Sequence, residues 1–214
     1  MARRPVFIPN YTGSLLVQER FFDFTWYSGF AESQKKKNVI ALHVAAKRNG
    51  IEKVLEISTK SENKIGRRLS AFSLKIEIGA VEYPLESVYQ GSKIFDKLGP
   101  FPEIFDFEPR EAKRFIRELN GGQLIGFDLG GRRYPLVPKN AFYDWLYIRA
   151  LAKHVEWIDK NVSYDAYTDI EFNPEKQVNC QARAFAEYKS LAARSELLAA
   201  VQDFNYFVSI LPPI

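Results

Sequence analysis

Residues 69–97, LSAFSLKIEIGAVEYPLESVYQGSKIFDK, hold the pattern that decides the fold. Apolar and polar residues alternate along residues 74–83, and the alternation is interrupted at Gly79. A period of two is typical of strands, and a glycine in the connecting pair supplies the positive φ that a tight hairpin needs. The sequence therefore predicts a hairpin that leads directly into a helix over residues 85–97, with its start fixed by Pro84.

Strand-like and helix-like segments also follow one another along the rest of the chain, without internal repeats. Their order does not repeat the strand–helix–strand unit of a doubly wound sheet, so the sequence predicts an α+β fold. We expect a predominantly helical single domain with short antiparallel hairpins over residues 1–214, in which residues 1–50 form an N-terminal extension packed on it. Further strands are expected over residues 20–27 and 51–57 and in a hairpin over 125–136 that turns at Gly130-Gly131; further helices are expected over residues 36–49, 109–120, 140–153, 180–193 and 195–207, the last with Ser195 as its N-cap.

The amino-acid composition excludes several classes of protein. The chain has 214 residues, of which 46% are hydrophobic and 26% charged, as is typical of globular domains. It holds one Cys and two His, which exclude a disulfide scaffold and argue against a Cys- or His-based metal site. No apolar run approaches the roughly 20 residues that span a bilayer. We therefore expect a cytoplasmic protein with no metal, no cofactor and no membrane partner.

The charge balance permits an anionic partner without requiring one. The 30 Lys and Arg outnumber the 26 Asp and Glu, which gives a net charge of +4 and a pI near 9.0. The basic residues gather in four clusters, and solvated helix ends or turns explain each cluster taken alone better than phosphate contacts do. The clusters are Lys35-Lys36-Lys37, which we expect to be a solvated helix end, Lys64 with Arg67-Arg68, Lys113-Arg114 and Arg132-Arg133.

The expected helix over residues 85–97 carries the first candidate site. At 100° per residue, Glu86, Gln90 and Lys93 lie within one narrow arc, with Tyr89 beside them. An acid, an amide and an amine on one stripe can protonate a leaving group, orient a sugar and supply a nucleophile. The alternative is a solvent-facing stripe, which the spacing alone favours modestly; the position directly after a hairpin argues for a site.

A second candidate lies between residues 164 and 179. Asp169 and Glu171 are separated by one residue, so both carboxylates would point the same way in an extended segment. Paired carboxylates push their pKa values apart, which divides acid and base roles. A polar loop edge explains the pair equally well.

A weaker candidate lies at residues 58–60. Ser58, Thr59 and Lys60 follow an expected strand end, where hydroxyls and backbone amides often bind phosphate or sugar oxygens, but they lack the glycine pattern of a phosphate loop.

The histidines and the cysteine are expected to have no catalytic role. His43 and His154 fall on or beside helices, and we expect both to be structural. Cys180 has no His partner nearby in the sequence, so an inert buried thiol is the better interpretation.

Four motifs in the same order resemble the NADAR family. The first two are Leu69-Ser70-Ala71-Phe72 and the helix Leu85-Glu86-Ser87-Val88-Tyr89-Gln90-Gly91-Ser92-Lys93; the others are Pro109-Arg110-Glu111-Ala112-Lys113-Arg114 and an acidic segment around Glu171 with a late Asn179. The resemblance covers roughly residues 55–195. Ala71 stands where the family usually has Asn, Ser87 where many members have His, and Asn173-Pro174 where a Trp-Gly segment is usual. With these departures the sequence is most similar to the branch encoded beside DarT-type DNA ADP-ribosyltransferase toxins.

The resemblance implies an ADP-ribosyl hydrolase that acts as an antitoxin. Its substrate would be ADP-ribose joined to the exocyclic amino group of guanine in DNA, and its partner could be the cognate toxin. The family's lysine corresponds to Lys93 and its acids to Glu86 and Glu171, with Asp169 as a further acid that activates water or holds the ribose. The expected substrate-binding residues are Gln90, Tyr89, Asn179, Ser58, Thr59, Lys60, Ser70, Phe72, Arg67 and Arg114.

Two other functions remain open from the sequence. The same fold could cleave the N-glycosidic bond of ribosylamino-pyrimidine intermediates of riboflavin synthesis, although the departures from the family motifs argue against it. The chain could also be a non-catalytic module that binds ADP-ribose or sequesters the toxin.

Overall fold

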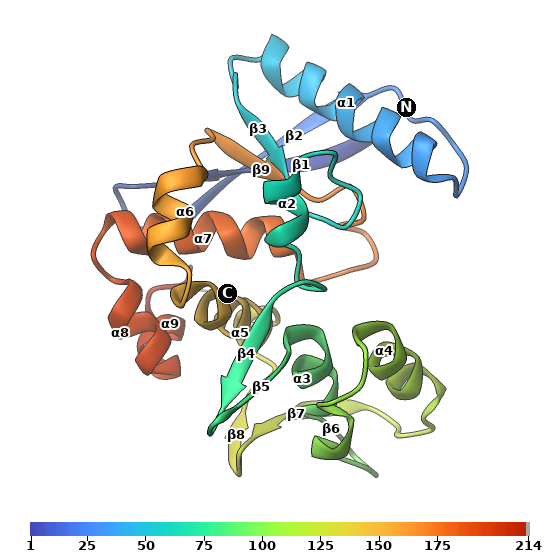
Figure 1. Cartoon of the computed structure of the whole chain (residues 1–214), viewed down its shortest axis with the longest axis vertical. Helices are drawn as coiled ribbons and strands as arrows, with labels where there is room; N and C mark the ends of the chain where they lie inside the picture. The colour runs from blue at the N-terminus through green and yellow to red at the C-terminus, as the bar shows by residue number, and fades with distance from the viewer. Residues whose placement is uncertain (213–214) are drawn as a thin grey trace.

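A computed structural model describes residues 1–212, which form a four-stranded sheet, a three-stranded sheet and a two-stranded hairpin joined by helices (Figure 1). The first sheet has the strand order β2-β1-β9-β3, from strands Val17–Phe24, Ala2–Pro9, Ala166–Thr168 and Val54–Glu56. β1 pairs antiparallel with β2 and with β9, whereas β3 and β9 are parallel. The predicted strand over residues 20–27 corresponds to β2.

Helices cover both faces of this first sheet (Figure 1). Neighbouring side chains of a strand point to opposite faces, and β1 shows this with Val6 and Phe7. Val6 packs in one apolar cluster with Leu42 of α1 (Glu32–Arg48), whereas Phe7 packs in another with Phe185 of α7 (Gln181–Ala193). The first strand of the chain is therefore buried between two layers of helix.

The second sheet lies at the opposite end of the molecule (Figure 1). Its order is β6-β7-β8, from strands Lys93–Phe95, Leu124–Leu129 and Arg132–Tyr134. β8 forms an edge of the sheet, a position that tolerates the prolines that follow it. Beside it lie the predicted hairpin, β4 (Lys75–Ile78) with β5 (Val81–Pro84), and the helices that carry the candidate motifs. These are α3 (Leu85–Gly91) and α4 (Pro109–Glu118), with a 3-10 turn, η1 (Pro102–Ile104), between them.

The remaining helices fill the space between the sheets. α5 (Ala141–Ala152) is buried along almost its whole length, and its aromatic side chains account for much of the aromatic content of the core. The other elements are α2 (Lys64–Arg68), α6 (Val155–Asn161), α8 (Leu197–Gln202) and α9 (Phe204–Ser209). The α+β class with short antiparallel hairpins is confirmed. That residues 1–214 form a single domain stays a prediction.

Three local predictions are wrong. The helix predicted over residues 85–97 ends at Gly91, and Lys93 begins strand β6, because residues 93–95 pair with β7 instead of continuing the helix. Residues 195–207 form two helices rather than one, and Ser195 is no N-cap. Its φ of 61° places it in the left-handed region that ends α7, where the amide of Glu196 donates to the carbonyl of Leu191.

The two acids of the second candidate also lie in a different local structure from the one expected. Asp169 and Glu171 follow β9 in a turn rather than an extended segment. The turn is closed by Asp169 itself, whose Oδ1 accepts the amide hydrogen of Glu171 at 3.0 Å. Asp and Asn side chains commonly fix turns in this way.

Candidate active site

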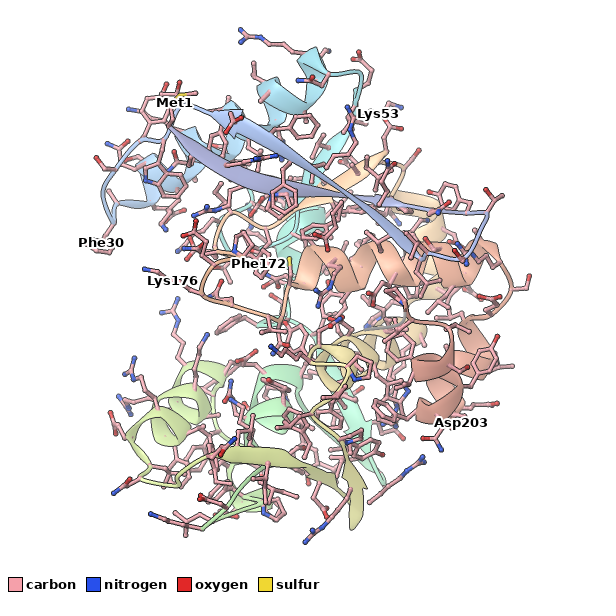
Figure 2. All side chains as sticks on the ribbon, turned by 180° about the vertical axis from the view of Figure 1, so that it is seen from behind. Met1, Phe30, Lys53, Phe172, Lys176 and Asp203 are labelled. Carbon is pink, nitrogen blue, oxygen red and sulfur yellow. The ribbon has the colours of Figure 1, made fainter. Side chains whose placement is uncertain are left out.

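The candidate residues from both parts of the sequence line one pocket of about 340 Å³. One wall comes from α3 and the start of β6, and the other comes from residues 169–181 between β9 and α7. Figure 2 labels Phe172 and Lys176 on this second segment, which faces the half of the molecule that holds α3 and α4. The pocket is lined by Ala71, Phe72, Glu86, Tyr89, Gln90, Lys93, Lys113, Tyr143, Asp169, Glu171, Phe172, Gln177, Val178, Asn179 and Gln181.

Lys93 is the partly buried amine of this pocket. Its Nζ donates to Gln90 Oε1 at 2.6 Å and lies 5.0 Å from the centre of the Tyr89 ring. Burial lowers the pKa of Lys93 to about 8, the charge of Glu86 opposes this shift, and the charge of Lys113 adds to it. A substantial fraction of the amine is therefore neutral, and hence nucleophilic, near neutral pH.

Three residues of the first motif form a chain of hydrogen bonds. Gln90 donates through Nε2 to Glu86 Oε1 at 2.8 Å while its Oε1 accepts from Lys93. This links acid, amide and amine in the order that the sequence spacing suggested, even though Lys93 lies beyond the helix. Gly91 makes the arrangement possible, because a Cβ at this position would lie 2.6 Å from the carbonyl oxygen of Phe101. The backbone of Phe101 therefore approaches α3 closely at Gly91.

Asp169 stands on the opposite wall. Its Oδ2 accepts from Gln181 Nε2 at 3.0 Å, and Gln181 Oε1 accepts the amide hydrogen of Ala71 at 2.8 Å. Gln181 thus ties the acid to the turn at residues 69–72. Burial raises the pKa of Asp169 to about 7, and the charge of Glu171 adds to this shift. The carboxyl group can therefore both give and take a proton near neutral pH.

Aromatic side chains close the base of the pocket. The Tyr89 ring meets the Tyr143 ring edge-on, with centres 5.1 Å apart, and its hydroxyl accepts a hydrogen bond from Asn179 Nδ2 at 2.7 Å. Burial raises the pKa of both tyrosines, so both hydroxyls are neutral and serve as hydrogen-bonding groups. The structure therefore brings the late Asn179 of the fourth motif against the helix of the second.

A basic pocket of about 330 Å³ adjoins the first one. The two pockets share Phe72, Lys113, Glu171, Gln177 and Gln181. The structure places the predicted Ser58, Thr59, Lys60, Ser70 and Arg114 here, together with Arg110 and Arg117, which sequence reasoning missed. Their spacing along α4, with Lys113, is the signal that could have found them, since residues three and four apart share one helix face.

Arg67 does not join the predicted phosphate-binding residues. Its Nη1 donates to the carbonyl oxygens of Ser61 and Glu62 at 2.6 and 2.9 Å, and it lines neither pocket. The guanidinium group holds the loop after β3 in place, so its contribution to the site is the shape of the loop that carries residues 58–60.

The sequence reasoning also missed a buried carboxylate, Glu56, which is 2% exposed at the end of β3. It accepts hydrogen bonds from Ser58 Oγ at 2.6 Å, Thr168 Oγ1 at 2.7 Å and the amide of Ile170 at 2.9 Å. Thr168 and Ile170 flank Asp169, so Glu56 fixes the backbone that presents this acid. Burial, and then the charge of Asp169, raise the pKa of Glu56 to about 8.

The two histidines and the cysteine have structural surroundings. His43 Nε2 lies 2.8 Å from Thr168 Oγ1, and burial lowers its pKa to about 4, so the ring is neutral and extends the Glu56 network. Cys180 is a free, buried thiol, as expected. His154 precedes α6, away from the residues that line either pocket.

We expect Glu56→Gln to fold normally and Glu56→Ala to lose about 2–5 kcal/mol of unfolding free energy, because alanine leaves three buried donors without an acceptor. The amide of glutamine mimics the protonated carboxyl group. Because the pKa of Glu56 is raised to about 8 in the native protein, Glu56 adds to the free energy of unfolding at low pH. This contribution is complete below about pH 4.5 and is lost as the pH rises through about 8. Denaturant unfolding from pH 5 to 9 measures both effects.

The matched control for Glu56 is Glu52→Ala, since Glu52 is exposed and pairs only with Lys47 in the described structure. It should change stability by less than about 0.5 kcal/mol. A Glu56→Ala protein as stable as the native one would contradict the structural role of the buried carboxylate.

Within the described residues, 1–212, no three His, Cys, Asp or Glu side chains are grouped so as to hold a metal ion. No helix among residues 1–212 has the length and apolar character that a membrane crossing needs.

An amine whose lowered pKa leaves part of it neutral, and which faces carboxyl groups across a polar pocket, is suited to breaking a bond between a sugar carbon and nitrogen. This is the reaction of an N-glycosidase. Comparison with protein families agrees with this class. A family model described as "DarT1-associated NADAR antitoxin" matches residues 2–213, and the chain therefore belongs to that family. NADAR proteins form an N-glycosidase superfamily, so the chain falls among hydrolases, with an antitoxin role toward a DarT1 toxin. No curated protein matched the sequence.

Proposed function

We propose that the protein hydrolyses the N-glycosidic bond between ADP-ribose and the guanine amino group in DNA, and so reverses the modification made by its toxin. The observation that carries the proposal is the Lys93 amine, held partly buried at the junction of α3 and β6 with its pKa lowered to about 8. Membership in the DarT1-associated family supports the substrate.

The geometry suggests a route through ring opening. Proton transfer from Glu86 to the ring oxygen breaks the C1″–O4″ bond, opens the distal ribose and leaves an iminium group between C1″ and the guanine nitrogen. The neutral Lys93 amine adds to C1″, and one proton of the added lysine nitrogen passes to the guanine nitrogen. The C1″–guanine bond then breaks, which releases the guanine amino group and leaves a lysine iminium. Asp169, across the pocket, then activates water, which adds to C1″ of the lysine imine. Release of the lysine yields the aldehyde of ADP-ribose, so one water is consumed for each bond broken.

The adjoining basic pocket has the chemistry to hold the pyrophosphate. Lys60, Arg114 and the hydroxyls of Ser58 and Thr59 line it next to Lys113, which is shared with the first pocket. Cations and hydroxyl donors of this kind bind phosphate oxygens through charge-assisted hydrogen bonds. Phe72, also shared, would lie against a sugar or the adenine, and Glu171 would meet ribose hydroxyls. An antitoxin that repairs the cell's own DNA would act in the cytoplasm.

The direct test is release of ADP-ribose from a single-guanine oligonucleotide modified by a DNA ADP-ribosyltransferase. We expect stoichiometric ADP-ribose and restoration of the unmodified oligonucleotide, measured by chromatography and mass spectrometry. A chain that binds the modified oligonucleotide without cleaving it would be a sequestering module instead. Turnover of ribosylamino-pyrimidine nucleotides with no turnover of the oligonucleotide would assign the pocket to the riboflavin-type reaction.

A further inference from the structure

The first 48 residues carry the whole excess of positive charge in the chain. They hold eight Lys and Arg against three Asp and Glu, a net charge of +5, whereas residues 49–214 hold 22 against 23. Charge of one sign gathered in one segment attracts an anionic partner to that segment. The question is whether these cations border a surface that a particular anion would fit.

A groove of about 480 Å³ lies along α1 in this segment, and we call it the α1 groove. Its lining includes Tyr27, Ile40 and Val44, three large apolar or aromatic side chains that are 40–53% exposed. Lys37 and Arg48 line the same groove and are eleven residues apart, which corresponds to about 16 Å along a helix. Asp23 supplies the one carboxylate among its described lining residues. The groove therefore combines an apolar floor with a cation toward each end.

The exposed aromatic side chain that lines the groove is Tyr27, and two hydrogen bonds fix its backbone. Asn38 is fully buried; its Oδ1 accepts the amide hydrogen of Tyr27 at 2.7 Å, and its Nδ2 donates to the Tyr27 carbonyl at 3.0 Å. Lys37 Nζ lies 5.8 Å from the centre of the Tyr27 ring. A ring on a fixed backbone with an ammonium group beside it can stack with one base while the cation meets the adjoining phosphate.

The helix α1 lies between the groove and the active-site pocket, because Lys35 and Lys37 are two residues apart and project from opposite faces of the helix. Lys35, two residues before Lys37, places its Nζ 3.2 Å from Oε1 of Glu171, which lines both pockets of the site. Within the cluster at residues 35–37, which the sequence predicts to be a solvated helix end, Lys35 is therefore held by an ion pair, with its side chain only 20% exposed. Figure 2 shows Phe30, which is fully exposed at the turn before α1, on the same side of the molecule as Lys176.

We propose that the α1 groove binds the single-stranded DNA that flanks the modified guanine, an inference that rests on the proposed function. Charge selects a polyanion, and the exposed aromatic and apolar lining selects unpaired bases, whose faces a duplex hides by stacking. The catalytic pocket would then engage the ADP-ribosyl group, while the groove, on the other face of α1, would hold nucleotides farther along the same strand. This assigns a substrate-binding role to the part of the chain that the family motifs leave without one.

The test measures binding and turnover separately. Binding of a short, fluorescent, unmodified single-stranded oligonucleotide is followed by anisotropy for the native protein, Lys37→Ala/Arg48→Ala and Tyr27→Ala. We expect each variant to weaken binding about five-fold or more. The double variant should also lower the slope of log affinity against log salt by about 0.7 for each phosphate that the protein no longer neutralises.

Two variants serve as controls. Lys47→Ala, on the same helix but paired with Glu52, should bind as the native protein does. Tyr27→Phe keeps the ring and should therefore keep the stacking that Tyr27→Ala removes.

Turnover then separates this inference from the proposed function. Both groove variants should cleave ADP-ribosylated guanosine at the native rate and the modified oligonucleotide with a raised KM. If the native protein cleaves neither substrate, the proposed function fails, and the anisotropy data still decide the groove. Native binding in every variant, or a preference for duplex over single strands, overturns the groove assignment. The groove assignment is also overturned if the variants lose self-association but bind DNA as the native protein does. That result would assign the groove to a second copy of the chain.

Discussion

Lys93→Ala should lower ADP-ribose release by on the order of 1,000-fold or more, because it removes the amine that captures the sugar carbon. Lys93→Arg should be nearly as inactive, since a guanidinium group keeps the positive charge but is not a nucleophile at accessible pH. Borohydride added during turnover should trap ADP-ribose on Lys93 of the native protein as a reduced, mass-detectable adduct. Lys97→Ala is the matched control, because Lys97 is exposed and lines neither pocket.

The same lysine predicts the direction of the pH profile. Because the pKa of Lys93 is lowered to about 8, its neutral fraction rises from about one-tenth at pH 7 to about half at pH 8. The pKa of Asp169, raised to about 7, adds a second step in the same direction if its carboxylate is the base. We therefore expect kcat to rise between pH 6 and 8.5. Full activity in Lys93→Ala together with no trapped adduct would exclude the covalent route.

Glu86→Gln should lower turnover by roughly 100- to 10,000-fold, the usual effect of removing a positioned general acid or base. The substitution is nearly isosteric, and its side-chain oxygen can still accept the hydrogen bond from Gln90 that the native carboxylate accepts at 2.8 Å. The affinity for modified DNA should therefore remain within a few-fold of the native value. Single-turnover rates, measured beside equilibrium binding, separate the two quantities.

This variant also discriminates repair from sequestration. In cells that express the toxin, a sequestering protein would protect with or without the Glu86 carboxylate, whereas a hydrolase would protect only with it. Glu118→Gln, an exposed acid at the end of α4, provides the matched control and should protect fully. Undiminished protection by Glu86→Gln would contradict the catalytic role assigned to this acid.

Local sequence patterns were sufficient for much of the fold. The hairpin of β4 and β5, the helix α4 that begins at Pro109 and the turn at Gly130 were all predictable, because each depends on neighbours within a few residues. The first sheet was not predictable in this way. β9 has three residues, and its partners in β1 and β3 lie more than a hundred residues away. No local alternation of apolar and polar residues therefore predicts that these strands pair.

The candidate site also contains both residues that a local pattern predicted and residues that only the fold brings together. Glu86, Gln90 and Lys93 share a local spacing that predicted their grouping, although the helix that was expected to hold all three ends at Gly91. Glu56 carried no such signal, because a carboxylate at a strand end is ordinarily exposed. Only the fold brings Thr168 and Ile170 to it, 112 and 114 residues away. Acids that are buried by distant segments cannot be distinguished from surface acids by spacing alone.

The position of β9 between β1 and β3 has a consequence for synthesis on the ribosome. Tyr167 pairs with both Phe7 and Leu55, so the sheet cannot be completed until translation has passed Thr168. A nascent chain shorter than this carries Lys93 but lacks Asp169 and the strand that positions it. We therefore expect neutralising capacity to appear only with nearly full-length product, which makes the supply of antitoxin sensitive to any event that interrupts elongation.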